Sequence, residues 1–310
     1  MHFTFIGAGA VGGFYGALLA RQGHDVSFVA RGAHRDAIAR DGLRVAGPLG
    51  DFTVRVRAES DPARLGQADV VVLAVKTYDN PTAIPMIAPL MGQKSVVLSL
   101  QNGVESADEI AAVVGKAATI GGATYIATAI EAPGVIRQTG THRRIVLGEY
   151  FDTPARVSDR VQAIAQAMTA ADIHAEAVPD ARPAIWEKFT YLAPFAAFTG
   201  AARLPIGPLW ADPEIKAMFL EAVAEVRGVA MAHGITLPAD HPDRTRAYLD
   251  KLPPSTRSSL LIDLSQVKRI EVEALQGSVV RFGRKVGVPT PIMAALYAVL
   301  KPHVNGAMGQ

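Results

Sequence analysis

The chain has 310 residues, a net charge of +2 and 19% charged residues, so no strong basic field marks a nucleic-acid partner. It contains no cysteine, which excludes disulfides and thiolate chemistry and makes a cytoplasmic location the expectation. Its hydrophobic residues, 49% of the total, fall in short runs that are too brief for a membrane span, and its scattered histidines predict no metal site.

A strand, a glycine turn and a helix follow one another directly at the start of the chain. The apolar strand 3–6 precedes a G-x-G-x-x-G motif, and a helical pattern covers 11–22. In a dinucleotide site the first glycine permits a tight turn, the second lets the backbone approach a pyrophosphate, and the third lets helix and strand pack closely. The N–H groups at the helix start would hold the pyrophosphate. The predicted cofactor-binding residues of this segment are Gly7, Gly9, Ala10, Val11 and Gly12.

The second strand, at 25–30, indicates which dinucleotide is bound. NAD sites usually carry an acidic residue near its end, where it binds the ribose 2′-hydroxyl. Here Arg31 takes that place and Arg35 follows one turn later. Because a guanidinium can bind a 2′-phosphate, the sequence predicts NADP(H). The alternative, a solvated loop arginine, is stronger for Arg35 than for Arg31.

Strands and helices alternate up to about residue 179, which is typical of an open parallel sheet. The predicted strands are 2–7, 25–30, 52–58, 69–75, 95–100 and 118–129, with helices starting near 10, 33, 81 and 105. An antiparallel hairpin is expected at 131–149, with turns at 133–134 and 139–141. A helix at 157–171 and a short strand at 174–178 complete this half.

The strand signal ends at Pro183, and the remainder predicts an all-helical domain. The expected helices are 183–200, 212–234, 242–251, 258–286 and 291–301. The fold class is therefore α/β, with an N-terminal Rossmann-type parallel sheet domain and a C-terminal all-α domain. We expect residues 1–179 to bind NADP(H), and residues 180–310 to bind substrate behind a cleft and to support a homodimer through their apolar surface.

Polar side chains stand at two strand ends of the sheet half. Lys76 ends the strand 70–75, and Asn102 follows the strand 96–100. Ligands of open α/β sheets lie beyond the carboxyl ends of the strands, so both are candidates to border the nicotinamide and the substrate. A solvated lysine at a strand end is the alternative for Lys76 taken alone.

Lys188 lies on an apolar face of the first helix of the helical half. Its neighbours at helical spacing are Ile185, Leu192 and Phe195. Burial would lower the pKa of this lysine and help it release a proton. Alternatively, the side chain extends from the apolar face to water.

Glu271 is expected at the centre of another apolar face, formed by Leu264, Val267 and Leu275 on a helix spanning 260–279. A buried carboxylate is costly unless it is paired or binds a ligand, with a structural salt bridge as the alternative. Ser259, near the start of this helix, could help to hold a substrate carboxylate, although a serine there needs no function.

These residues resemble the ketopantoate reductase (2-dehydropantoate 2-reductase) family over essentially the whole chain. The shared motifs are GAGAVG at 7–12, Arg31, Val75-Lys76-Thr77, Gln101-Asn102-Gly103, Trp186-Glu187-Lys188-Phe189, and Ser258-Ser259 with Glu271 downstream. The resemblance implies NADPH-dependent reduction of a 2-keto acid, in the family's case 2-dehydropantoate to pantoate for pantothenate synthesis. It makes Lys188 the general acid and Glu271 the residue that binds the reacting oxygen and hydroxyl. It makes Ser259 the partner of the substrate carboxylate, with Lys76 and Asn102 beside nicotinamide and substrate.

The chain departs from the family pattern at two positions. Asparagines usually lie one and two turns beyond the catalytic lysine, whereas this chain has Leu192 and Ala196. Loss of both amides favours a more apolar 2-keto acid as an alternative substrate. A non-catalytic NADP(H) sensor and a dehydrogenase of 3-hydroxy acids or glycerol phosphate are the other readings.

Overall fold

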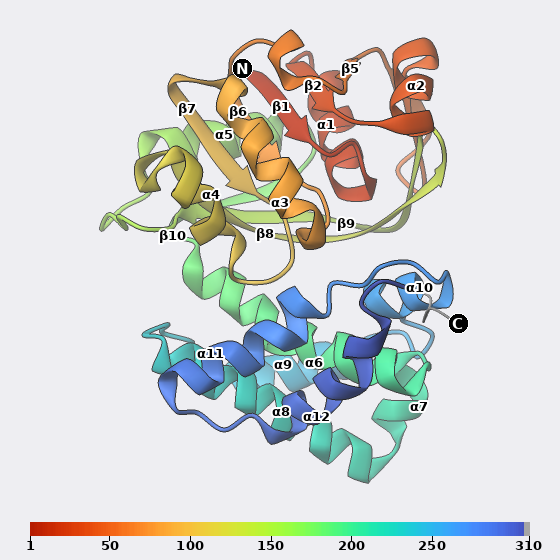
Figure 1. Cartoon of the computed structure of the whole chain (residues 1–310), viewed down its shortest axis with the longest axis vertical. Helices are drawn as coiled ribbons and strands as arrows, with labels where there is room; N and C mark the ends of the chain where they lie inside the picture. Colours follow the sequence, from red (N-terminus) through yellow and green to blue (C-terminus); the bar gives the residue numbers. More distant parts are fainter. Residues whose placement is uncertain (307–310) are drawn as a thin grey trace. The chain divides into compact units, whose positions relative to one another are not determined.

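The computed structural model describes residues 1–306, which form two compact units (Figure 1). Residues 1–101 and 106–182 form one, here called the sheet unit; residues 102–105 join those from 183 onward in the other, the helical unit. The α/β class, with a mostly parallel sheet followed by a helical region, is confirmed. The assignment of cofactor binding to 1–179 and of substrate binding to 180–310 stays a prediction.

The sheet unit is built on one mixed sheet with the order β4-β3-β9-β8-β7-β6-β1-β2-β5, and β10 pairs with β9. Its strands are β1 (His2–Ile6), β2 (Asp25–Val29), β3 (Leu43–Ala46), β4 (Phe52–Val54), β5 (Arg57–Glu59), β6 (Ala68–Leu73), β7 (Met91–Ser99), β8 (Thr119–Ala132), β9 (Val135–Glu149) and β10 (His174–Asp180). β1 lies in parallel between β2 and β6, with Ile6 opposite Val29 and Leu73. The carboxyl ends of these central strands therefore share one edge of the sheet.

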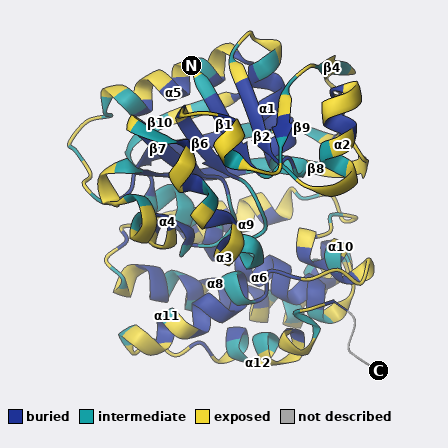
Figure 2. Ribbon diagram, turned by 45° about the horizontal axis from the view of Figure 1, so that its top comes forward, coloured by how far each residue is buried: buried dark blue, intermediate teal, exposed yellow. Residues whose placement is uncertain are grey.

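Helices cover both faces of the parallel part of this sheet because its strands are apolar on both sides. They are α1 (Ala10–Arg21), α2 (Gly32–Asp41), α3 (Asn80–Ala83), α4 (Ser106–Val114) and α5 (Asp159–Ala170). Phe3, Phe5 and Val72 pack in the core that includes α1 and α5, whereas Val71 and Leu73 face the core on the α3 and α4 side. Figure 2 shows buried residues along these strands and on α1.

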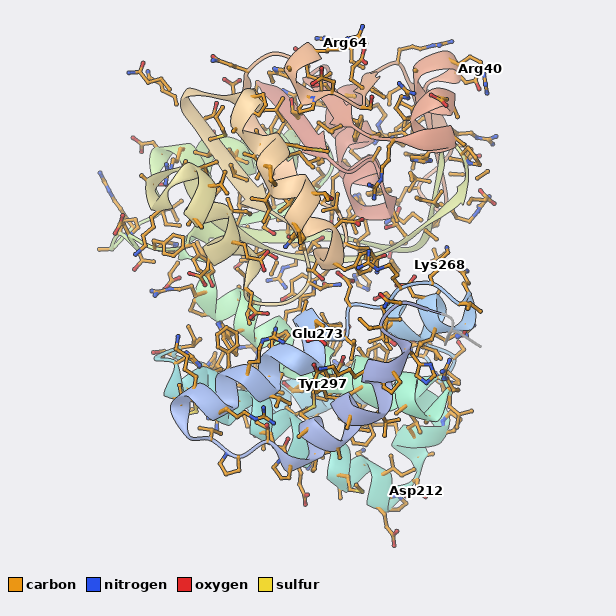
Figure 3. All side chains as sticks on the ribbon, viewed as in Figure 1. Arg40, Arg64, Asp212, Lys268, Glu273 and Tyr297 are labelled. Atoms are coloured by element: carbon orange, nitrogen blue, oxygen red, sulfur yellow. The ribbon has the colours of Figure 1, made fainter. Side chains whose placement is uncertain are left out.

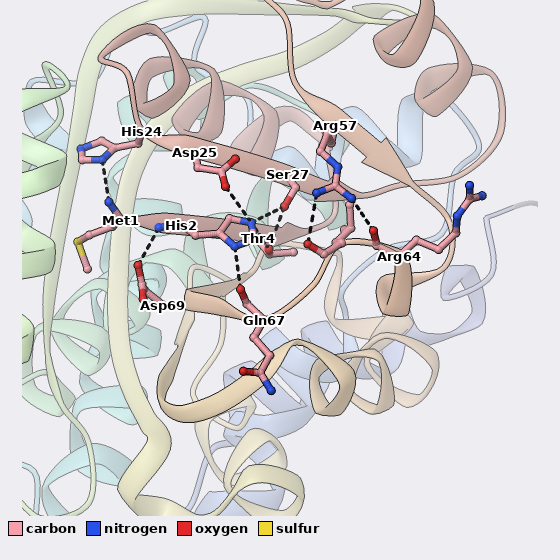
Figure 4. A network of polar contacts seen from close by, with 11 residues as sticks. Met1, His2, Thr4, His24, Asp25, Ser27, Arg57, Arg64, Gln67 and Asp69 are labelled. Carbon is pink, nitrogen blue, oxygen red and sulfur yellow. Dashed lines mark hydrogen bonds and ion pairs between the residues drawn. The ribbon is translucent and has the colours of Figure 1, made fainter.

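A polar network closes the amino ends of three parallel strands (Figure 4). The hydroxyls of Thr4 and Ser27 are fully buried and lie 3.0 Å apart. His2 contacts Ser27 through Nε2 at 2.9 Å and donates from Nδ1 to the carbonyl of Gln67 at 2.8 Å. Each buried hydroxyl therefore has a partner, as burial requires.

Three predicted features of the sheet unit were wrong. The segment 52–58 is not one strand: β4 and β5 lie on opposite edges of the sheet, and β3 had been missed. The hairpin is β8 with β9, so its first strand continues from 119 through 132. Its turn lies at 133–134 as expected, but no second turn follows, because β9 runs on through 139–141 with only a shift of register there. A glycine in a strand often marks such an irregularity instead of a turn.

The helical unit contains seven α-helices and one π-helical turn among its described residues. They are α6 (Arg182–Ala202), α7 (Ile206–Ala211), α8 (Pro213–Ala232), α9 (His241–Asp250), α10 (Ser259–Ser265), the π turn Glu273–Gly277, α11 (Ser278–Val286) and α12 (Pro291–Leu300). α6 supplies a run of buried residues to a single core, and Asp212 caps α8 (Figure 3). The helical prediction is confirmed, although α7 had been missed.

The predicted continuous helix 258–286 is wrong. α10 ends at Ser265, and Val267 adopts the left-handed conformation with φ 55° and 61% exposure. The amide of Ile270 then donates a hydrogen bond to the carbonyl of Val304, so a contact with a segment distant in sequence stabilises the non-helical chain after α10. The apolar face proposed through Val267 therefore does not exist.

Among residues 1–306, no helix combines the length and apolarity needed to cross a bilayer. Within the same range, no group of three or more His, Asp or Glu side chains could hold a metal ion.

Candidate active site

The glycine loop between β1 and α1 has the geometry that its motif predicts. Gly7 has φ 104°, a conformation that favours glycine. A Cβ on Gly12 would lie 2.2 Å from the carbonyl oxygen of Gly7 and 2.9 Å from the Cβ of Ala74, so helix and sheet meet too closely for any side chain. A Cβ on Gly9 would meet no described atom within 4 Å. The backbone at Gly9 is thus open to a ligand.

The start of α1 fits an anionic group. Gly9 is the N-cap and has no side chain with which to cap the helix, and the first turn, which contains Ala10 and Val11, has no acidic residue. Backbone N–H groups of such a turn lack helical partners and lie at the positive end of the helix dipole. These residues fit the pyrophosphate of a dinucleotide.

Arg31 is the N-cap of α2 and follows the carboxyl end of β2. Its side chain is 77% exposed, and Nη2 lies 3.3 Å from Oδ2 of Asp79. An ion pair this exposed contributes little to stability, so the guanidinium can change partner at low cost. Arg35 instead pairs with the adjacent Asp36 at 2.7 Å.

Lys76 follows β6 and caps a short 3-10 turn, Thr77–Asp79, with its side chain half-buried. The preceding carbonyl, that of Val75, accepts a hydrogen bond of 2.8 Å from Nε2 of Gln101. Since Gln101 follows β7, this bond joins the segments after β6 and β7 and fixes the backbone on which Lys76 stands.

A second pair of side chains holds Gln101. Its Nε2 also donates to Oδ1 of Asn80 at 2.6 Å, and Nδ2 of Asn80 donates to Oε2 of Glu109 at 2.5 Å. Sequence reasoning gave Asn80 no role, and it assigned Glu109 only to a capping box at 106–109. The sequence signal for Asn80 was an asparagine at the start of the mostly apolar segment 80–90, and the structure shows that its side chain is buried.

The segment 102–105 belongs to the helical unit, and three of its residues contact that unit. A Cβ on Gly103, which has φ 96°, would lie 3.0 Å from the carbonyl oxygen of Ala274. Val104 is buried in the helical core, and Glu105 pairs with Arg281 at 2.7 Å. These contacts hold Asn102 against the helices although it directly follows the sheet unit in sequence.

Lys188 and Asn102 meet in the helical unit. Nζ of Lys188 donates a hydrogen bond of 2.8 Å to Oδ1 of Asn102. Burial lowers the pKa of Lys188 to about 8, and the negative charge of Glu271 partly opposes this shift. Glu271 is itself only 6% exposed. The structure therefore places two of the predicted residues, Asn102 and Glu271, beside a third, Lys188, whose ammonium releases its proton more readily than that of an ordinary lysine.

Glu271 is buried as expected, but for a different reason from the one predicted. It lies after the break that follows α10, two residues before the π turn begins at Glu273, and its carbonyl accepts from the amide of Leu275 at 3.0 Å. Glu273, two residues on, instead contacts Tyr297 at 2.7 Å and Arg281 at 3.1 Å (Figure 3). π turns often occur at functional sites.

Ser259 is exposed and forms the first residue of α10. The N-cap is the preceding, buried Ser258, which accepts from the amide of Leu261 at 3.0 Å and contacts the hydroxyl of Thr199 on α6 at 2.7 Å. Ser258 thus carries the structural role, which sequence reasoning did not assign, and the substrate role of Ser259 stays a prediction.

The two positions that depart from the family pattern lie on α6 beyond Lys188. Ala196 is 1% exposed, and Leu192 is half-buried against the helical core. Neither can offer a hydrogen bond through its side chain. Any ligand group beside this face meets hydrocarbon.

Comparison with known proteins agrees with this architecture. The family model described as "Ketopantoate reductase PanE/ApbA" matches residues 3–151, and its C-terminal counterpart matches residues 180–304. A 2-dehydropantoate 2-reductase of Nostoc sp. is 30% identical over 302 residues, covering 96% of this chain and 94% of that protein.

Solved structures share the same fold. A PanE/ApbA family ketopantoate reductase from Ralstonia eutropha superposes with a TM-score of 0.89 at 32% identity, covering 98% of both chains. A D-mandelate dehydrogenase with NADH and anilino(oxo)acetate gives 0.88 at 21% identity over 98% of both chains, a likeness of fold alone. This chain therefore belongs to the ketopantoate reductase PanE/ApbA family and is an enzyme of a family of NAD(P)-dependent reductases that form 2-hydroxy acids.

Proposed function

We propose that this protein reduces a 2-keto acid to the corresponding 2-hydroxy acid with NADPH, and that Lys188 is the general acid. The supporting observation is the 2.8 Å hydrogen bond from Lys188 to Asn102 beside the buried Glu271, with burial lowering the pKa of Lys188 to about 8. A general acid works best when its pKa lies near the working pH.

The residues divide the chemistry among them. The reduced nicotinamide, when bound, supplies the hydride that adds to the keto carbon. Lys188 transfers a proton from Nζ to the keto oxygen, so that hydride and proton together convert C=O to CH–OH. Asn102 accepts from Nζ and so fixes the direction of the ammonium. Glu271 is proposed to bind the reacting oxygen and hydroxyl, and Ser259 the substrate carboxylate.

The cofactor proposal rests on the sheet unit. Gly7 and Gly12 permit the tight turn and the close packing of the loop, Gly9 leaves it open to a ligand, and Ala10 and Val11 form the uncapped first turn of α1. Arg31 is the proposed partner of the 2′-phosphate, since its guanidinium is 77% exposed and its ion pair with Asp79 can be exchanged at low cost. Lys76 and Asn102 are proposed to border the nicotinamide. Residues 1–179 would thus bind NADPH and residues 180–310 the substrate.

Two substrate classes remain in competition. The curated relative from Nostoc favours 2-dehydropantoate, and with it a place in pantothenate synthesis. Leu192 and Ala196 favour a keto acid with a more apolar side chain, because they replace amides by hydrocarbon. A small-molecule keto acid is the proposed partner in either case, with a cytoplasmic location and a homodimer as further proposals.

The decisive experiment measures NADPH oxidation across 2-keto acids of increasing bulk, with wild type, Lys188→Ala and the exposed-lysine control Lys285→Ala. We expect Lys188→Ala to lose turnover by at least about a hundredfold while it still binds NADPH, and Lys285→Ala to match wild type. Substantial activity in Lys188→Ala would remove the assigned acid. NADPH binding by wild type without turnover of any keto acid would overturn the proposed substrate class.

The variant Leu192→Asn tests the substrate class. If the hydrocarbon at this position sets the preference, the added amide shifts relative kcat/KM toward 2-dehydropantoate and away from apolar keto acids. An unchanged preference order would show that this face does not contact the substrate side chain.

A further inference from the structure

His34 joins three separate parts of the sheet unit. It lies in the first turn of α2 and is half-buried. Its Nε2 is 2.8 Å from the carbonyl oxygen of Ala8 in the glycine loop. Its Nδ1 is 3.0 Å from the backbone nitrogen of Gly134, in the turn between β8 and β9. One imidazole thus bonds to the nucleotide loop on one side and to a distant hairpin turn on the other.

The two bonds fix the protonation state of the ring. The amide of Gly134 can only donate, so Nδ1 must accept, and Nε2 must therefore carry the proton that is donated to Ala8. A doubly protonated ring would lose the bond to Gly134. Burial lowers the pKa of His34, which favours this neutral form at neutral pH.

The hairpin turn is a firm support for the ring. Gly134 has φ 76°, and a Cβ there would lie 3.0 Å from the Cβ of Ala37 on α2, so the turn packs closely against that helix. The carbonyl of Gly134 accepts from the amide of Arg44 at 2.9 Å. Both backbone groups of the turn are therefore engaged, and the ring of His34 is held on one edge.

On its other edge, the ring of His34 binds the glycine loop through Nε2. Ala8 stands between Gly7 and Gly9 and is 3% exposed. A Cβ on Gly13 would lie only 2.9 Å from the carbonyl oxygen of Ala8, so this carbonyl packs closely against the first turns of α1. A buried carbonyl without a donor is costly, and glycines on both sides leave the peptide free to turn when the donor is lost.

We propose that His34 is a positioning residue that holds the glycine loop in the conformation that binds the pyrophosphate. The inference rests on the proposed function, since it assigns a residue to the support of the same cofactor site. The pyrophosphate is common to NADPH and NADH. Loss of His34 therefore weakens the binding of NADPH and of NADH by the same factor. Loss of Arg31 weakens the binding of NADPH alone, because only NADPH carries the 2′-phosphate.

The test separates the two bonds by side-chain length. In His34→Gln the amide reaches the place of Nε2 and can donate to Ala8; in His34→Asn it reaches only the place of Nδ1 and can accept from Gly134. Dissociation constants for NADPH and NADH are measured by fluorescence titration, with thermal midpoints alongside and the exposed His174→Ala as the control for loss of an imidazole.

We expect His34→Ala and His34→Asn to bind both cofactors about fivefold to tenfold more weakly, the effect of one lost hydrogen bond, and His34→Gln to recover most of the affinity. Equal behaviour of the Asn and Gln variants, or wild-type affinity in His34→Ala together with a lowered thermal midpoint, would reduce His34 to a structural residue. Failure of the wild-type chain to bind either cofactor overturns the proposed function and this inference together, whereas tight wild-type binding that His34→Ala leaves unchanged overturns this inference alone.

Discussion

The pH dependence of reduction gives a direct test of the proposed acid. Burial lowers the pKa of Lys188 from its ordinary 10.5 to about 8. Roughly nine-tenths of the side chains carry the proton about one pH unit below that value, and roughly one-tenth about one unit above it. Because only the protonated form can donate, kcat/KM for reduction should be level below about pH 8 and then fall about tenfold for each further pH unit.

The variant Glu271→Gln sharpens this prediction. The carboxylate of Glu271 raises the pKa of Lys188 against the effect of burial. Replacing it by a neutral amide of the same shape removes that attraction, so the alkaline fall in kcat/KM should move to lower pH. Lys188→Arg is the complementary variant: a guanidinium keeps its proton throughout the range, and the fall should disappear at a lower overall rate.

The assay follows NADPH oxidation at low substrate and saturating cofactor over the alkaline range, with NADPH binding measured in parallel. Activity that stays level to about pH 10 in the wild type would show that Lys188 titrates as an ordinary lysine. An alkaline fall that persists unchanged in Lys188→Arg would assign it to another group. Either result refutes the reasoning from burial.

Three further predictions concern single residues. Arg31→Glu should weaken NADPH by roughly tenfold to a hundredfold in titrations and leave NADH much less affected, because it replaces a charge-assisted bond to the 2′-phosphate by repulsion; equal losses for both cofactors would contradict the assignment. Ser258→Ala should lower the free energy of unfolding by about 1–2 kcal/mol in denaturant titrations, since it removes the cap of α10 and the bond to Thr199. The adjacent Ser259→Ala should leave stability unchanged and raise KM for the keto acid, and a wild-type KM would remove it from the substrate site.

Much of the sheet unit could be predicted from local sequence. The glycine loop is encoded by neighbouring residues: Gly7 needs a positive φ, and Gly12 leaves no room for a side chain. Strand and helix periodicities are equally local, so β1, β2 and α1 lie where the pattern placed them. Lys188 could be singled out because its helical neighbours are apolar.

Long-range contacts decided what local patterns could not. The short strand β3 was missed because it forms by pairing with β4 and β9. The residues Leu43–Ala46 by themselves do not indicate that pairing. The break after α10 was missed because the apolar spacing continues through it, whereas the bond from Ile270 to Val304 holds the chain out of a helix. The prediction that Glu271 is buried was correct although the helix invoked for it does not exist.

The sequence by itself determined the dinucleotide loop, the two-part fold and the identity of the chemical groups, because these depend on residue type and on spacings within a few turns. Tertiary structure alone decided that Asn102 to Glu105 join the helical unit, where Asn102 accepts from Lys188, that Ser258 and not Ser259 caps α10, and that His34 bridges the glycine loop to a turn one hundred residues away. The physical reason is that a hydrogen bond or a pKa shift depends on which atoms become neighbours in space. The separation of two residues along the chain does not determine the distance between their atoms in the folded protein.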